Sequence, residues 1–230
     1  MSQSFSINDY QSFYTEVINY RRYILTNETK LFLNRYRCEI KKNFITLSKG
    51  NIYYRAQNGF LNERSRKHPY QKERMFPLPK KASEGRINPK GIPYLYLTEE
   101  LENSVYEIRA KYRSYITIAE FCLKRNIDVV YFHKRMEYFH YALLSEKEKN
   151  PDLSVWNEIN KAFSMPVDQS DFTADYVPTQ ILAEIVKDEG FDGILYMSQY
   201  MDCYNLCLFN VNDAEFLNSS LTYIRSKYYE

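Results

Sequence analysis

Residues 85–109 read GRINPKGIPYLYLTEELENSVYEIR, an order that predicts a turn-rich loop, a short strand and a helix without a spacer. Gly85 and the run at residues 88–91 favour tight turns, because glycine tolerates positive φ and proline fixes its own φ. Residues 94–97 alternate tyrosine and leucine, which places the tyrosines on one face of a strand and the leucines on the other. We expect the tyrosines to line a pocket and the leucines to face the core.

The helix after this strand carries a carboxylate at a useful position. Thr98 is a typical N-cap, and the three glutamates that follow at residues 99–102 complement the positive end of a helix. Leu101, Val105 and Ile108 have the spacing of a buried stripe. Glu107 then lies at the edge of that stripe, where its side chain can face a cleft.

These residues resemble the RES domain family, which is named for an arginine, a glutamate and a serine and is related to the ADP-ribosyltransferase fold of diphtheria-like toxins. Two further blocks carry the resemblance. YYRA at residues 53–56 is similar to the family's opening strand, and YVPTQILAEIVKDEGFDGILYMSQYMDCYNLCLF at residues 176–209 is similar to its closing half. The blocks follow the family order over roughly residues 50–215, which argues against a chance match.

The resemblance implies an α+β fold: an ADP-ribosyltransferase-like mixed β core with surrounding helices. Residues 1–48 precede the similar region and have helical periodicity, so we expect an N-terminal helical extension at 1–48 and the RES domain at 49–230. The extension either packs on the domain or meets a partner, and packing is the preferred interpretation.

Periodicity and turn residues predict the remaining elements. Strands are expected at residues 52–55, 94–97, 113–122, 127–132, 193–197 and 205–210. Helices are expected at residues 8–45 with a break near Thr26, at 136–145, at 155–164, from Pro178 to Gly190, and at 221–229. Residues 57–93 form a long, polar, basic connection of little periodicity, which we expect to be a mobile flap over the site.

The chemistry that the resemblance implies is cleavage of NAD. Arg55 and Arg86 are the expected phosphate ligands, because a guanidinium grips phosphate oxygens in a bidentate way. Glu107 is the expected catalytic carboxylate, which stabilises the oxocarbenium-like ribose as the nicotinamide bond breaks. Ser198 is expected to orient the nicotinamide amide or Glu107. It is not expected to be an acyl nucleophile, because no Gly-x-Ser-x-Gly elbow surrounds it.

Four further residues are expected to bind NAD. Tyr54 and Tyr96 are candidates for stacking on a ring of the substrate, and Gln180 and Asn205 are candidate polar supports. Taken singly, each candidate also has an ordinary structural explanation, such as a surface ion pair for an arginine or a turn cap for a serine. The resemblance is what brings them together.

Composition limits the other function classes. The net charge of +2 gives no global basic excess of the kind that indicates nucleic acid or an anionic membrane as a partner. The basic residues at 64–90 read as a solvated surface loop, Arg86 excepted. Four cysteines without a CxxC pair and three histidines without metal-ligand spacing favour buried free thiols and no metal. Without a signal pattern or a long apolar run, we expect a cytoplasmic protein that does not bind a membrane.

Three interpretations of function follow. The first is an NAD-degrading toxin, a glycohydrolase or phosphorylase, which the resemblance implies is held inactive by a cognate antitoxin. The second is ADP-ribosyl transfer to a protein, which breaks the same bond but uses a side chain as the acceptor. The third is an RNA-binding module built on abundant tyrosine and the basic loop. It ranks last because the tyrosines are spread over helices and no known RNA-binding motif is present.

Overall fold

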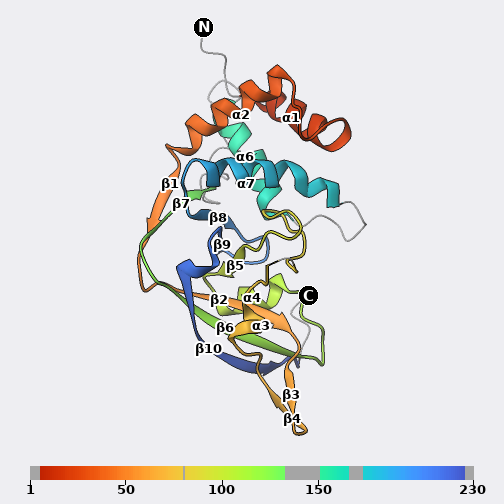
Figure 1. Ribbon diagram of the computed structural model, residues 1–230, viewed down its shortest axis with the longest axis vertical. Helices are drawn as coiled ribbons and strands as arrows, with labels where there is room; N and C mark the ends of the chain where they lie inside the picture. Colours follow the sequence, from red (N-terminus) through yellow and green to blue (C-terminus); the bar gives the residue numbers. More distant parts are fainter. Residues whose placement is uncertain (1–5, 80, 133–150, 166–172, 226–230) are drawn as a thin grey trace.

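The structure, a computed structural model, describes residues 6–225 apart from 80, 133–150 and 166–172 (Figure 1). Its helices are α1 (Ile7–Asn19), α2 (Asn27–Ile40), α3 (Lys72–Met75), α4 (Leu101–Glu107), α6 (Pro151–Ser164) and α7 (Val177–Asp188), with 3₁₀ turns η1 (Thr173–Tyr176) and η2 (Val211–Asp213). Its strands are β1 (Phe44–Leu47), β2 (Ile52–Asn58), β3 (Leu61–Glu63), β4 (Arg66–His68), β5 (Leu95–Thr98), β6 (Tyr115–Leu123), β7 (Ile127–Tyr131), β8 (Gly193–Met197), β9 (Tyr204–Leu208) and β10 (Ala214–Tyr223).

An eight-stranded mixed sheet forms the centre of the fold, with the order β1-β7-β8-β9-β5-β2-β6-β10. β7 and β8 pair in parallel, because the chain between them crosses over through α6 and α7. The other neighbouring strands pair antiparallel. A mixed sheet with surrounding helices confirms the predicted fold class.

The helices α1, α2, α6 and α7 gather at one end of the sheet, beside β1, β7 and β8 (Figure 1). Their apolar faces share one core cluster, in which Phe13, Tyr36 and Trp156 pack with Ile194 of β8. The N-terminal helices therefore pack on the rest of the chain, and β1 joins the sheet by pairing with β7. A domain division after residue 48 stays a prediction.

Two further clusters complete the core. Leu95 and Leu97 of β5 pack with Phe121 in one of them, which confirms that these leucines face the core. Val105 of α4 packs with Ile118 of β6 in the other, so α4 covers the part of the sheet made by β2 and β6.

The sheet is weakest between β2 and β5. These strands pair at one register position, Tyr54 opposite Thr98, and then diverge. The side chain of Arg55 in β2 bridges the two strands, because its Nη1 donates a hydrogen bond to the main-chain oxygen of Tyr96 in β5 at 3.1 Å. A cavity opens at this divergence, with α4 on one side of it.

The predicted C-terminal helix at residues 221–229 is wrong for the residues that the structure describes. Residues up to Tyr223 belong to β10, which pairs with β6 as far as Tyr115. A strand forms because β6 offers a free edge, a long-range partner that local periodicity does not report. The predicted helix at 136–145 lies outside the described residues.

The connection at residues 57–93 is more regular than predicted. β2 extends to Asn58, and β3 and β4 form a hairpin whose two turn residues, Arg64 and Ser65, both have positive φ. The short helix α3 follows. Lys67 of β4 lies 3.9 Å from the ring centroid of Tyr115, a cation–π contact that holds the hairpin against β6. The prediction of an aperiodic connection is therefore wrong for these residues.

Local details of four other predictions also differ. Thr98 ends β5 and does not cap a helix, because α4 begins three residues later at Leu101, with Glu100 at the N-cap position. Leu101 is exposed, whereas the polar Asn103 and Ser104 are buried. The second N-terminal helix ends at Ile40, and residues 44 and 45 are in a strand. The four cysteines are free thiols as predicted, but Cys38 is exposed and Cys122 is half-buried.

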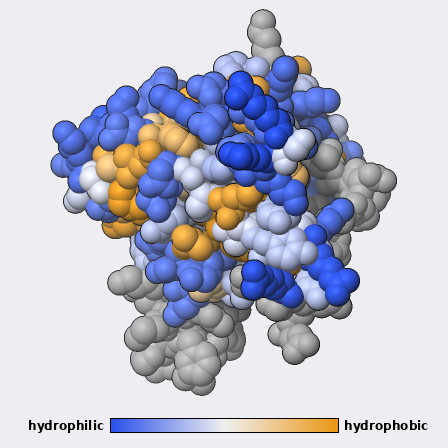
Figure 2. Space-filling model, turned by 90° about the horizontal axis from the view of Figure 1, so that it is seen from below, coloured by the Kyte–Doolittle hydropathy of each residue, from blue (hydrophilic) through white to orange (hydrophobic). Residues whose placement is uncertain are grey.

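The face of the molecule seen in Figure 2 is mostly hydrophilic, and hydrophobic residues appear on it as small separate patches. Such patches are ordinary on a protein surface and do not by themselves indicate a partner. None of the helices in the described part of the chain has both the length and the apolar character needed to cross a bilayer.

Candidate active site

A cavity of about 290 Å³ lies where β2 and β5 diverge. One wall comes from these two strands, a second from α4, and a third from the loop that begins at Gly85. Its lining includes Tyr54, Arg55, Gly85, Arg86, Tyr96, Thr98, Ser104, Glu107, Tyr176, Tyr196 and Asn205. Six of the eight predicted site residues are in this lining, which leaves Ser198 and Gln180 to be placed.

Glu107, the last residue of α4, points its carboxylate into this region. Its Oε1 accepts a hydrogen bond from Nδ2 of Asn205 at 2.6 Å and lies 3.2 Å from Oγ of Ser198. Among the described residues, Oε2 accepts no hydrogen bond. The carboxylate is therefore fixed through one oxygen, and the other remains available to a ligand.

Ser198 lies just behind Glu107, directly after β8. Its Oγ accepts a hydrogen bond from the main-chain N–H of Tyr200 at 3.1 Å, so its one proton goes either to Glu107 or to Oδ1 of Asn103 at 2.8 Å. The side chain is buried. Its position suits orientation of Glu107 and does not expose a nucleophile to the cavity.

Arg55 lies at the point of divergence. One nitrogen of its guanidinium is committed to the carbonyl of Tyr96, while Nε is buried without a partner among the described residues. Burial lowers the pKa of Arg55 to about 10, which still keeps it a cation at neutral pH. The unused donors leave this arginine able to bind an anion in the cavity.

Arg86 is held by a helix end. Its Nη1 donates to the carbonyl oxygens of Phe163 and Ser164, at 2.7 and 2.8 Å, at the C-terminus of α6. A cation there compensates the negative end of the helix dipole. The arginine thus has a structural role, and it also lines the cavity.

Tyr96 and Gln180 organise the loop that carries Arg86. The Tyr96 hydroxyl donates to Oδ1 of Asn88 at 2.7 Å and accepts from the N–H of Ile87 at 3.1 Å. Gln180 donates from Nε2 to the carbonyl of Gly85 at 2.9 Å. An added Cβ on Gly85 would lie 2.7 Å from the Asn88 side chain and 2.9 Å from the Tyr96 hydroxyl, so this close packing needs glycine.

A comparison with protein families identifies the family of this chain. The model of the RES domain family matches residues 61–225, more than half of the chain. The chain belongs to the RES domain family. Tyr54 and Arg55 lie just before the matched segment, although the structure brings both into the cavity.

No curated protein sequence matches this RES-family chain. Among solved structures, a chain of the M. tuberculosis MbcT–MbcA toxin–antitoxin complex is similar at 12% sequence identity and a TM-score of 0.47. The similar region covers 81% of this chain and 91% of that one.

The RES-family cavity includes residues that the sequence analysis did not name. Tyr196 of β8 and Tyr176 of η1 line it, and burial raises the pKa of Tyr196 well above its ordinary value, so its phenol stays protonated. Strand periodicity was a usable signal for Tyr196, because it stands two residues before Ser198 and therefore on the same face.

Asn103 is the other residue that the sequence analysis missed. It is fully buried one helical turn before Glu107 and contacts three polar side chains of the site. The spacing of four residues to Glu107 was the available signal.

A second cavity, of about 520 Å³, adjoins the first. Arg55, Gly85 and Tyr96 line both, and Arg74 and Lys81 add positive charge to the second. Among the residues that the structure describes, no three His, Cys, Asp or Glu side chains are grouped so that they could hold a metal ion.

Proposed function

We propose that this RES-family chain is a toxin that breaks the bond between nicotinamide and ribose in NAD, as a glycohydrolase or a phosphorylase. The observation that carries the proposal is the position of Glu107, which is held through one carboxylate oxygen in a cavity that two arginines also line. The RES family resemblance supplies the substrate.

The carboxylate matches the charge that develops in this reaction. As nicotinamide leaves, the ribose becomes oxocarbenium-like, and a fixed negative charge near it lowers the barrier. Among the described residues, Glu107 is contacted only by the neutral side chains of Asn205 and Ser198, so its charge is not cancelled by an ion pair within that set. Its second oxygen suits a ribose hydroxyl or the developing cation.

The arginines match the diphosphate. Arg55 lies between the two adjoining cavities, and Arg86 lines the cavity that contains Glu107. A dinucleotide has two nucleoside halves joined by this diphosphate, so we place one half in each cavity and the phosphates near Arg55. Tyr54, Tyr96, Asn205 and Gln180 keep supporting roles, the first two by packing against a ring and the last through the loop.

We also propose that a cognate antitoxin inhibits the enzyme in the cytoplasm, as the family resemblance implies. An NAD-degrading enzyme harms its own cell unless it is restrained. An inhibitor that covers the mouth of the first cavity would compete with NAD.

The decisive experiment is incubation of the purified protein with NAD and separate measurement of nicotinamide and of the ADP-ribose product. Free ADP-ribose indicates hydrolysis, a phosphorylated product formed only with inorganic phosphate indicates phosphorolysis, and modified protein indicates transfer. The Glu107→Gln variant is the matched control. If no nicotinamide is released in water alone, with inorganic phosphate or with candidate target proteins, and RNA binding is strongly salt-dependent, the RNA-binding interpretation would replace the proposal.

A further inference from the structure

Both the nitrogen and the oxygen of the Asn103 side-chain amide form hydrogen bonds inside the protein. Its Nδ2 donates to Oγ1 of Thr98 at 2.7 Å and to Oδ1 of Asn205 at 3.0 Å. Its Oδ1 accepts from Oγ of Ser198 at 2.8 Å, the shorter of the two contacts that compete for the Ser198 proton. The residue is completely buried, and a buried amide with both ends satisfied has one defined orientation.

The orientation is fixed from the main chain outward. Thr98 donates its hydroxyl proton to the carbonyl oxygen of Tyr204 at 3.2 Å, and a carbonyl can only accept. With its proton committed there, the Thr98 oxygen accepts from Asn103, which presents N–H to it at 2.7 Å; the Sγ of Cys203 lies farther away, at 4.0 Å. The same NH₂ group also donates to Asn205, which therefore accepts with its side-chain oxygen.

The orientation of Asn205 decides whether Glu107 faces a hydrogen-bond donor or an acceptor. Because the oxygen of Asn205 faces Asn103, its Nδ2 faces Glu107 and donates at 2.6 Å. With the opposite orientation, an amide oxygen would face a carboxylate oxygen, and two acceptors with no proton between them repel each other.

We infer that Asn103 is a positioning residue, which fixes the polarity of a hydrogen-bond relay from the Tyr204 carbonyl through Thr98 and Asn205 so that Glu107 always receives a donor. It does not touch the substrate in this scheme. The inference deepens the proposed function, since it concerns the carboxylate on which that function rests.

Asn103→Asp reverses the relay without changing the shape of the side chain. An aspartate offers only acceptors, so Asn205 must turn its NH₂ toward it and its oxygen toward Glu107. In the Glu107→Gln background the reversed relay is satisfied, because glutamine can donate to that oxygen. Asn103→Asp should therefore destabilise the wild type more than it destabilises Glu107→Gln.

The first test is a double-mutant cycle on urea unfolding of the full-length protein without NAD, which does not depend on the proposed activity. We expect the two substitutions to be coupled by about tenfold in the unfolding equilibrium constant. Ser104→Asp is the control for simple charge repulsion, since Ser104 is also buried on α4 but donates only to the helix carbonyl of Leu101. Additive effects at position 103, or equal coupling at 104, would overturn the inference.

The second test uses an uncharged variant, in case a buried aspartate prevents folding. Thr98→Val keeps the shape and removes the acceptor that fixes Asn103, so both orientations of the relay become available. If the protein cleaves NAD, we expect kcat to fall several-fold while KM stays within about twofold, because only the transition state needs the charge of Glu107. An unchanged kcat in an active protein would contradict the relay. An inactive wild type would refute the proposed function and leave the unfolding cycle to decide the role of Asn103.

Discussion

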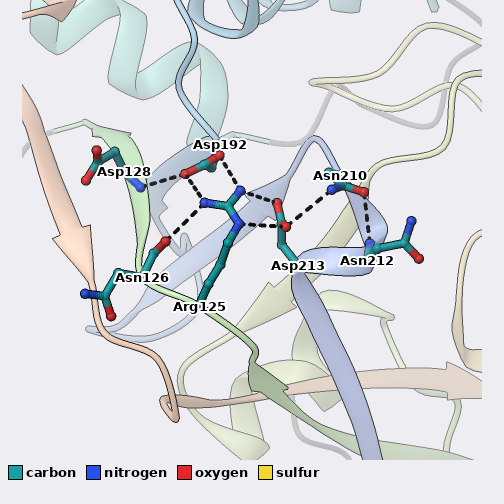
Figure 3. A network of polar contacts seen from close by, with 7 residues as sticks. All are labelled: Arg125, Asn126, Asp128, Asp192, Asn210, Asn212 and Asp213. Carbon is teal, nitrogen blue, oxygen red and sulfur yellow. Dashed lines mark hydrogen bonds and ion pairs between the residues drawn. The ribbon is translucent and has the colours of Figure 1, made fainter.

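The two ends of strand β8 each hold a carboxylate in a polar network, and the networks treat it differently. At the start of the strand, Arg125 lies between Asp192 and Asp213 (Figure 3). Its guanidinium contacts both oxygens of Asp192, at 2.6 and 3.0 Å, and both oxygens of Asp213, at 2.8 and 3.0 Å. Each oxygen of these two carboxylates has a cationic partner.

At the other end of β8, Glu107 is held by neutral groups alone among the described residues, and through one oxygen. The difference separates a structural acid from one that can act. Asp192 and Asp213 form ion pairs with Arg125, and these ion pairs connect the β6–β7 turn, the start of β8 and the turn before β10. Glu107 is fixed in place but keeps its charge and an open oxygen for a ligand.

The largest effect that follows from this contrast is on turnover. Glu107→Gln keeps the size of the side chain and removes its charge, so NAD cleavage should fall about a hundredfold or more. NAD affinity should change little, because the proposed phosphate ligands remain. Steady-state nicotinamide release and calorimetric titration of NAD measure the two quantities. Glu102→Gln, on an exposed face of the same helix, should behave like the wild type; near-normal turnover in Glu107→Gln would remove the proposed mechanism.

The opposite pattern is expected for the network at the start of β8. Arg125→Met leaves two carboxylates without their cation, and loss of hydrogen bonds between charged groups should lower the free energy of unfolding by about 2 kcal/mol. Nicotinamide release by the folded variant should stay near that of the wild type, because the network is remote from the cavity. Lys124→Met, the neighbouring exposed cation, should change stability by less than about 0.5 kcal/mol. An Arg125→Met protein of normal stability would show that the ion pairs are not structural.

A smaller effect is expected on substrate binding. Arg55→Lys and Arg86→Lys replace a two-pronged donor by a point charge, so each should weaken NAD binding by about tenfold. The measurement is best made in the Glu107→Gln background, where NAD is not consumed. Arg66→Lys, on the exposed hairpin, is the matched control. Unchanged affinity in both site variants would place the diphosphate elsewhere.

Residues 85–109 show what local sequence could predict. The turn residues, the alternating tyrosines and leucines and the acidic helix start gave β5, α4 and Glu107 in the right order, and β8 was predicted at Gly193–Met197, where it is found. These elements were predictable because each carries a local pattern, such as the alternating tyrosines and leucines around β5 and the short apolar run of β8. The fold class followed from the resemblance.

Three features that the sequence did not reveal depend on a partner distant in the chain. Residues 221–223 form a strand because β6 is there to pair with them. Asn103 reads as a solvated helix residue until Thr98, Ser198 and Asn205 surround it. The attachment of Arg86 to the end of α6 is equally invisible in the local sequence.

The smallest expected effect is the pH dependence of the Arg125 network. Burial alone would raise the pKa of Asp192, but the hydrogen bonds from Arg125 and from the N–H of Asp128 bring it below its ordinary value in the folded protein. Such a group stabilises the fold fully above the unfolded aspartate pKa of about 3.9, and the contribution is lost as pH falls through the lower folded value. The pKa of Arg125 is raised by both aspartates, so it stays charged throughout this range.

The stability difference between the wild type and Arg125→Met should therefore be constant near neutral pH and should shrink below about pH 4. Urea unfolding of both proteins from pH 7 to pH 3 measures it. Other acids with lowered pKa values, such as Glu16 and Glu189, are present in both proteins and cancel in the difference. Lys124→Met should show no such trend. A difference that stays constant down to pH 3 would mean that Arg125 does not hold Asp192 in its charged form, and the contrast between the two ends of β8 would then rest on geometry alone.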